Sequence, residues 1–382
     1  MAPDLWRISI KEGTMILGFR KFQHQLITPK DKNSSIKVLQ IGWADPSSSA
    51  KIKDGATMYT NKVLADLSGK VSIRYERISG FKSYVKWLVL IPKYRKQNID
   101  IIHMQGTGIH CAIGILLSML LRKPLIVTLY AYGLDERRSL HKSIVTGIIP
   151  ILIGWITISI SKEIITVSEW QKKRLGKNTR AKTIVIYPGI NQTRKNGTVE
   201  KKDDEAVCIT GSLLHRYRAF RKGIDILAEI AELTPKVTFH IVGGTRDQVR
   251  KILHKTPRNL VFHGYLDERS LQRLLTKSKF IIAPSRHEAF SIPVLEGMNY
   301  RCIPIISEYC GIQDIVNDCG FVLQLKPEFF STTLTTLLGK SDDVNRMGTN
   351  CERISRNFTW RQAAVKLAEV YQAVALSHRM KG

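Results

Sequence analysis

The stretch KFIIAPSRHEAFSIPVLEGM, residues 279–298, predicts a strand, a loop and the start of a helix. Its opening apolar run has the composition of a buried parallel strand. Ser291 is a favoured residue immediately before a helix, and Pro293 is tolerated only in a first helical turn, so we expect the helix to begin here. Glu288 then lies in the loop at the carboxyl end of the strand, and Glu296 lies little more than one turn inside the helix.

The expected helix start is a candidate anion site. Backbone amides at about residues 290–293, apart from the proline, have no partner inside the helix and carry the positive end of its dipole, which suits a diphosphate. Carboxylates beside this site cannot be there to bind phosphate. Glu288 and Glu296 can instead accept hydrogen bonds from hydroxyl groups on the two sides of the diphosphate, one from a sugar and one from a ribose. The alternative is that both are solvated surface charges, and the apolar residues around them argue against it.

Short apolar runs alternate with periodic, helix-like segments along the chain. Continuous apolar strands separated by amphipathic helices predict parallel sheets with helices on both faces. The alternation stops at residues 191–205, where Val199 is the one apolar residue, and then restarts. We therefore predict an α/β chain of two doubly wound, Rossmann-like domains that face each other across a cleft, with ligands beyond the carboxyl ends of the strands. The expected strands are 36–44, 99–104, 124–130, 163–168, 206–212, 237–244, 260–264, 279–285 and 302–308.

The composition is strongly basic. Lysine and arginine outnumber aspartate and glutamate by 59 to 32, for a formal net charge of +27. Such a surplus favours anionic partners, which include nucleotides, phosphorylated lipids, an acidic membrane surface and nucleic acid. The six cysteines lack C-x-x-C spacing, which indicates a reducing compartment and no zinc site. No secretory signal opens the chain, so we expect a cytoplasmic protein.

Two apolar segments without charges need a separate explanation. Residues 144–160 form a run of only 17 residues that includes Pro150, and the run at 109–121 is shorter still. We therefore do not expect either segment to cross a membrane. We expect both to be buried helices. The alternative is that a face of 144–160 dips into a membrane surface, which would place the protein peripherally on the cytoplasmic face of a membrane.

Residues 261–323 resemble the donor half of the glycosyltransferase family 4 enzymes, which have the GT-B fold. The E-x7-E motif of that family matches Glu288 and Glu296. A looser resemblance extends over about residues 36–371. Further matching stretches are ITVSEW (165–170), VIYPGIN (185–191), KGIDIL (222–227), HIVGG (240–244) and FTWRQAAVKLAEVY (358–371).

The resemblance implies a role for each part of the chain. We expect a weakly ordered extension at 1–35, an acceptor-side domain at 36–195 and a donor-binding domain for a nucleotide sugar at 196–358. A C-terminal helix at 359–382 is expected to pack back towards the N-terminal domain.

The resemblance also assigns a donor site. Lys222 matches the family's phosphate-binding lysine, Glu288 would hold hydroxyl groups of the donor sugar, and Glu296 would hold the ribose. Lys222 and Glu288 are the expected catalytic residues. The other expected donor contacts are the amides of Ala289, Phe290, Ser291 and Ile292 around the diphosphate, Tyr265 and Leu266 at the base, and Gly243.

The chain departs from the family pattern at three places. The family's arginine ahead of the lysine is replaced by Ser212, and either Arg218 or Arg221 could supply its guanidinium. Only Gly55 remains of a glycine pair near the first strand, and Tyr130 stands where a histidine is usual. Gly55 and Tyr130 are the expected acceptor-side residues.

The implied activity is transfer of a sugar from a nucleotide diphosphate sugar to a glycan or lipid-linked acceptor, with retention at the anomeric carbon. No cofactor and no metal are expected, so cations and amides must meet the charge on the diphosphate. Two alternatives stay open. One is a nucleotide-sugar epimerase of the same fold, and the other is a basic nucleic-acid-binding protein, although no recognised nucleic-acid motif is present.

Overall fold

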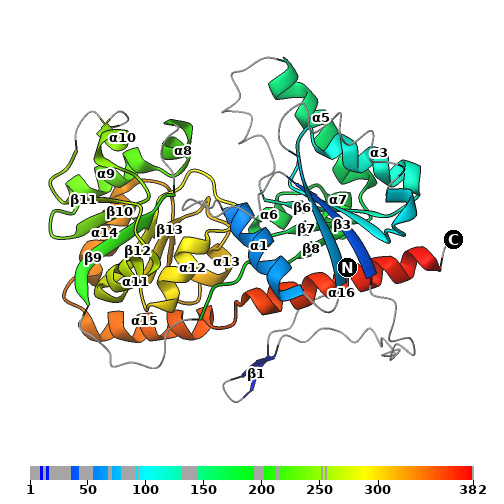
Figure 1. Ribbon diagram of the computed structural model, residues 1–382. Coiled ribbons are helices and arrows are strands. Elements are labelled where there is room, and N and C mark those ends of the chain that lie inside the picture. Colours follow the sequence, from blue (N-terminus) through cyan, green and yellow to red (C-terminus); the bar gives the residue numbers. More distant parts are fainter. Residues whose placement is uncertain are drawn as a thin grey trace. The chain divides into compact units, whose positions relative to one another are not determined.

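The computed structural model describes most of the chain (Figure 1). It divides into two units, Met1–Ser35 and Ile36–Gly382. In the first unit, strands β1 (Ser9–Lys11) and β2 (Thr14–Ile16) form an antiparallel pair, and the rest of the expected extension lies outside the described residues. The described residues are 9–11, 14–16, 36–42, 55–67, 71–78, 92, 94–130, 144–192, 202–211, 216–250, 253 and 256–380.

The second unit contains two six-stranded parallel sheets. The first has the order β4-β3-β5-β6-β7-β8, and apolar residues of its central strands are almost completely buried. Continuous burial on both faces is what the unbroken apolar runs predicted. Its strands are β3 (Ile36–Gly42), β4 (Val71–Arg77), β5 (Ile101–Gln105), β6 (Leu125–Leu129), β7 (Glu163–Thr166) and β8 (Thr183–Val185). Its helices are α1 (Gly55–Leu67), α3 (Cys111–Leu121), α5 (Ile144–Ile160), α6 (Glu169–Lys173) and α7 (Lys177–Ala181).

The second sheet has the order β11-β10-β9-β12-β13-β14. The chain therefore builds outward from β9 in one direction and then from β12 in the other, and the strand order reverses between these two neighbours. Its strands are β9 (Asp203–Ile209), β10 (Thr238–Val242), β11 (Leu260–Gly264), β12 (Ser278–Ala283), β13 (Ile303–Ser307) and β14 (Phe321–Leu323). Its helices are α8 (Arg216–Arg221), α9 (Ile224–Leu233), α10 (Arg246–Arg250), α11 (Glu268–Lys277), α12 (Ile292–Asn299), α13 (Gln313–Val316), α14 (Pro327–Leu337) and α15 (Ser341–Ser355).

The last helix, α16 (Trp360–Arg379), returns to the first sheet. It packs against α1, β3 and β5, and its residues Ala363, Leu367 and Tyr371 are buried. Thr359 caps its start with a side-chain hydrogen bond to the amide of Gln362, in a reciprocal capping box.

The two apolar segments form helices, but the prediction that they are buried is wrong in part. Helix α5 runs through Pro150, and Leu152 and Trp155 on it are exposed. Met119 on α3 is also exposed. None of the helices that the structure describes combines the length and the apolarity of a membrane crossing.

Candidate functional site

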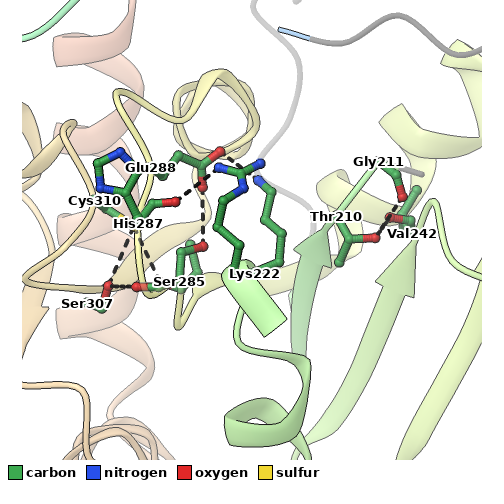
Figure 2. A network of polar contacts seen from close by, with 11 residues as sticks. Thr210, Gly211, Lys222, Val242, Ser285, His287, Glu288, Ser307 and Cys310 are labelled. Carbon is green, nitrogen blue, oxygen red and sulfur yellow. Dashed lines mark hydrogen bonds and ion pairs between the residues drawn. The ribbon is translucent and has the colours of Figure 1, made fainter. Parts of the chain in front are cut away.

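The predicted site residues Lys222 and Glu288 meet beyond the carboxyl ends of β9 and β12, where the strand order reverses. In doubly wound sheets this position is where ligands bind. Lys222 lies in the turn between α8 and α9, and Glu288 lies in the loop between β12 and α12. Figure 2 shows the lysine and Ser285 on the two sides of the Glu288 carboxylate.

Lys222 and Glu288 form a nearly buried ion pair. The Lys222 Nζ lies 2.6 Å from Glu288 Oε1, and the two side chains are only 10% and 12% exposed. Ser285 Oγ donates to the other carboxylate oxygen at 3.2 Å. Burial raises the pKa of Glu288, but the charges of Lys222 and Arg221 and these hydrogen bonds outweigh it, so its pKa lies below the ordinary value. Glu288 is therefore ionised at neutral pH, with its charge held in one position.

Gly223 fixes the position of the lysine. Its φ of +68° lies in the left-handed region, and a Cβ there would lie 1.8 Å from the carbonyl oxygen of Pro284. Only glycine allows this approach. The turn that carries Lys222 is thus pressed against the end of β12, from which the Glu288 loop departs.

The loop that carries Glu288 is held on both sides. The amide of Glu288 donates to Tyr309 O at 3.0 Å, and Gly311 donates back to Glu288 O at 2.8 Å. Ser168 follows β7 of the first sheet, and its Oγ donates to Ala289 O at 2.6 Å. These bonds make Glu288 part of a braced loop that both sheets contact.

The amides expected to hold a diphosphate start α12, as predicted from Pro293, which lies in its first turn. Among the described residues, the amides of Ala289, Phe290 and Ser291 donate to no protein group. The predicted role of Ser291 as a side-chain cap is wrong, because its φ of +106° turns the side chain away and it makes no capping hydrogen bond. The uncapped helix start leaves its amides available to a ligand.

The structure separates the two candidate arginines. The Arg221 guanidinium donates to His287 O at 3.0 Å, and its charge lowers the pKa of Glu288. Arg218 lies on the same helix, yet no described residue forms a hydrogen bond or ion pair with its side chain. Arg221 is therefore the arginine placed beside Glu288.

Glu296 stands in a different environment. It lies on α12 and is partly buried, and its carboxylate accepts no hydrogen bond from any described residue. Burial, with a smaller contribution from Glu268, raises the pKa of Glu296 to about 7. Among the described residues, Glu296 therefore has no hydrogen-bond or salt-bridge partner that would stabilise its charge.

The other predicted donor contacts follow β10 and β11. Gly243 has a φ of +103°, and a Cβ there would lie 2.5 Å from Gly211 O, so the ends of β9 and β10 approach closely. Tyr265 is 41% exposed, while Leu266 packs against the core. Their positions at the same edge of the sheet as Lys222 suit contacts to an extended ligand.

The predicted acceptor-side residues lie in the domain that contains the first sheet. Gly55 begins α1. The Tyr130 hydroxyl donates to Gln105 Oε1 at 2.5 Å and lies 3.1 Å from Thr60 Oγ1, and burial raises its pKa well above the ordinary value. His103, on the neighbouring strand β5, is completely buried.

Sequence reasoning missed two parts of the site. Ser285 contributes a hydrogen bond to Glu288, and its place three residues ahead in the same loop was the available signal. Ser168 braces the loop from the other sheet, and no local pattern could have shown a contact across so much sequence. Among the described residues, no cluster of His, Cys, Asp and Glu could hold a metal ion.

Two family models match the chain. The one described as Glycosyltransferase Family 4 matches residues 64–194, and the one described as Glycosyl transferases group 1 matches residues 204–340. An uncharacterized glycosyltransferase of Methanocaldococcus jannaschii is 25% identical over 286 residues, which are 73% of this chain and 77% of that protein.

A GDP-mannose-dependent alpha-(1-6)-phosphatidylinositol dimannoside mannosyltransferase of Mycobacterium tuberculosis is 24% identical over 161 residues. These residues are 41% of this chain and 42% of that protein, so the match spans less than half of either.

Solved structures show the same fold at low identity. Sucrose-phosphate synthase from Thermosynechococcus elongatus has a TM-score of 0.70 at 15% identity, over 90% of this chain and 100% of that one. Anabaena HepE in complex with UDP and glucose has a TM-score of 0.65 at 15% identity, over 88% of this chain and 100% of that one. These structures show the GT-B fold, and the two family models with the M. jannaschii relative show the class: the chain is a glycosyltransferase of the GT-B fold. The two family matches fall one in each domain, the Glycosyltransferase Family 4 model at residues 64–194 and the Glycosyl transferases group 1 model at residues 204–340.

Proposed function

We propose that this chain transfers a hexose or related sugar from a nucleotide diphosphate sugar to a glycan or lipid-linked acceptor, with retention and without a metal ion. The observation that carries the proposal is the ion pair of Lys222 and Glu288 beside the uncapped start of α12. A cation, an ionised carboxylate and free amides stand together, as a ligand with a diphosphate and sugar hydroxyl groups requires.

In the proposed mechanism the diphosphate lies at the start of α12. Lys222, Arg221 and the helix amides stabilise the negative charge that develops when the bond from the anomeric carbon to the phosphate oxygen breaks. The acceptor oxygen forms its bond to the anomeric carbon on the same face, and its proton passes to the departing phosphate oxygen. Glu288 holds the sugar hydroxyl groups, and Glu296 holds the ribose.

The comparisons support the choice of donor and acceptor as a proposal. HepE is described in complex with UDP and glucose, and the M. tuberculosis relative is named for GDP-mannose and a phosphatidylinositol dimannoside. Thermal shift with UDP, GDP and ADP identifies the base, because a ligand at 100 times its dissociation constant adds about 2.7 kcal/mol to the free energy of unfolding.

Metal independence is tested with a strong chelator. We expect turnover with the donor so identified to be unchanged in EDTA, because protein cations and amides hold the diphosphate. Turnover that EDTA abolishes and magnesium or manganese restores would show that a metal ion carries that charge.

Substitution of Glu296 and of Glu288 is expected to impair different steps, nucleotide binding in the first case and turnover in the second. Glu296→Gln should weaken binding of the bare nucleoside diphosphate, because its partner is the ribose. Glu288→Gln should bind the nucleotide with little change and lose turnover, by about 100-fold for a misplacement of the sugar of about an ångström. Isothermal titration and transfer kinetics on both variants measure the two effects.

The exposed Glu308 supplies the matched control for these variants. Glu308→Gln removes a carboxylate from the same domain and should change neither quantity. Equal loss of nucleotide affinity in Glu288→Gln and Glu296→Gln would overturn the separate roles, and full activity in both would overturn the donor site itself.

A further inference from the structure

Helices α3 and α5 both carry large apolar side chains that the described residues leave exposed. The two helices contact each other and both pack on β6, so they lie side by side on one face of the first sheet (Figure 1). Single exposed apolar residues are ordinary, but a group of them on adjacent helices marks an interaction site. We define the apolar face as Leu116, Met119 and Leu120 on α3 and Ile149, Leu152, Trp155, Ile156 and Ile160 on α5, all of them exposed.

Two large side chains of the apolar face are mostly exposed. Met119 is 70% exposed and Trp155 is 60% exposed. On α5 the exposed positions 149, 152, 156 and 160 follow the spacing of one helical stripe. Tryptophan is the side chain that prefers the boundary between water and lipid headgroups.

A basic groove adjoins the apolar face. It lies where α3 and α5 end beside α16, has a volume of about 560 Å³, and shares Met119 and Ile160 with the face. Arg122, Lys123 and Lys162 line it, together with His378. The groove therefore presents cations directly beside exposed apolar carbon.

Three of the charges in the groove have no direct partner among the described residues. No described residue forms a hydrogen bond or salt bridge with the side chains of Arg122, Lys123 or Lys162. The partly buried carboxylate of Glu163 attracts Lys162 without forming a salt bridge with it. Lys182, by contrast, is occupied, because its Nζ donates to Ile158 O and Ser159 O at 2.8 Å and so caps α5.

We propose that the apolar face of α3 and α5, with the basic groove at its edge, docks this chain on the surface of an anionic lipid bilayer. Apolar side chains enter the boundary of headgroups and acyl chains, and the groove receives a lipid phosphate. Stable attachment of a peripheral protein needs two such signals together, an apolar and a cationic one. The docking is independent of the donor chemistry proposed above.

Charge distinguishes the bilayer from a second copy of the chain. The described parts of residues 101–162 contain no aspartate or glutamate. A second copy that docked through the same helices would bring its own Arg122, Lys123 and Lys162 to the interface, where like charges repel, whereas anionic lipids offer these cations many partners.

Vesicle co-sedimentation tests the proposal with the full-length chain. We expect binding to vesicles of phosphatidylcholine with phosphatidylglycerol, weaker binding at high salt, and little binding to phosphatidylcholine alone. A triple variant, Arg122→Gln, Lys123→Gln and Lys162→Gln, should bind about 100-fold more weakly, since each cation near an anionic surface contributes about fivefold. The matched control, Lys236→Gln, Lys277→Gln and Lys340→Gln, removes three exposed charges of the second sheet's domain and should bind like the original protein.

Fluorescence tests whether the apolar face enters the lipid. Spin-labelled lipid should quench tryptophan emission, and Trp155→Phe should remove most of that quenching while leaving binding intact. Leu152→Ser combined with Trp155→Ser should lose binding itself, with circular dichroism confirming that the variant is folded.

Three outcomes would overturn the proposal. They are equal binding to neutral and anionic vesicles, equal losses in the two triple variants, and quenching that persists in Trp155→Phe. A fourth would replace it: if the serine variant binds vesicles normally but converts a dimer to a monomer in sedimentation velocity, the face joins two copies of the chain.

Discussion

Glu288 and Glu296 carry the same functional group in opposite electrostatic environments. Lys222 and Arg221 hold the pKa of Glu288 below its ordinary value, although burial acts against them. Glu296 has no such partner among the described residues, and burial raises its pKa to about 7. At neutral pH the first is fully charged, and the second is close to half protonated.

Ionisation of Glu296 is therefore expected to lower the free energy of unfolding as the pH rises. The unfolded chain releases this proton near the ordinary pKa of 4.5 and the folded chain only near 7, so stability falls between these values and is lowest above 7. Glu296→Gln, which has no charge at any pH, should raise the free energy of unfolding at pH 8, on the order of 1–2 kcal/mol after allowance for solvent screening at a partly exposed side chain.

Thermal melts of the unliganded protein at pH 8 and pH 4.5 measure this effect. Glu308→Gln, at an exposed carboxylate, is the control and should melt like the original protein at both values. A Glu296→Gln variant that is less stable at pH 8 would show that the carboxylate has a stabilising partner.

At the level of the elements, a close backbone contact between Gly223 and Pro284 brings Lys222 next to Glu288. Gly211 and Gly223 have nearly the same left-handed φ, +66° and +68°. The room for a side chain differs between them. A Cβ at Gly211 would meet no described atom within 4 Å, whereas one at Gly223 would lie 1.8 Å from Pro284 O.

The two glycines make a matched pair of variants. Gly211→Ala should lose about 1–2 kcal/mol of stability from backbone strain alone. Gly223→Ala has the same strain, and the turn must also move away from β12, so it should lose about 1–3 kcal/mol more. Denaturant titration measures both, and equal losses would show that the contact of Gly223 with Pro284 is easily relaxed.

The sequence predicted the elements that are buried on both sides. The runs at 36–44, 124–130 and 279–285 correspond to β3, β6 and β12, because a strand covered by helices is apolar at every position. The strands β4, β8 and β14 were missed. They lie at sheet edges or are short, and the residues of β4 alternate between exposed and covered.

The same distinction applies to the site. The local pattern of residues predicted Glu288 and the start of α12, and the resemblance to the family predicted Lys222. The ion pair itself, the role of Arg221 and the brace from Ser168 depend on contacts between segments far apart in sequence. The φ of Ser291 reversed an expectation from cap preference, since the surrounding loop, and not the residue type, sets that backbone angle.

Over the whole molecule, α16 follows the second sheet in sequence and packs on the first. Gln40 Nε2 donates to the Tyr371 hydroxyl at 2.7 Å, and that hydroxyl lies 2.6 Å from His103 Nδ1. Burial lowers the pKa of His103 to about 3, so the ring is neutral. The tyrosine then donates to Nδ1, and the Nε2 proton of His103 is directed at Thr128 Oγ1, 2.8 Å away.

Tyr371→Phe should therefore weaken the attachment of α16 to β3 and β5. The variant leaves the Gln40 amide without its acceptor and His103 Nδ1 without its donor, and each unsatisfied buried group costs about 1–3 kcal/mol. Amide hydrogen exchange on the intact chain localises the loss: exchange should accelerate in α16, β3 and β5 and stay unchanged in β9, β10 and β12. Tyr309→Phe, at an exposed ring in the other domain, should leave all six elements unchanged. If Tyr371→Phe accelerates exchange equally in both sheets, α16 stabilises the two as one cooperative unit; if it changes neither, the hydrogen bonds of Tyr371 do not hold the helix in place.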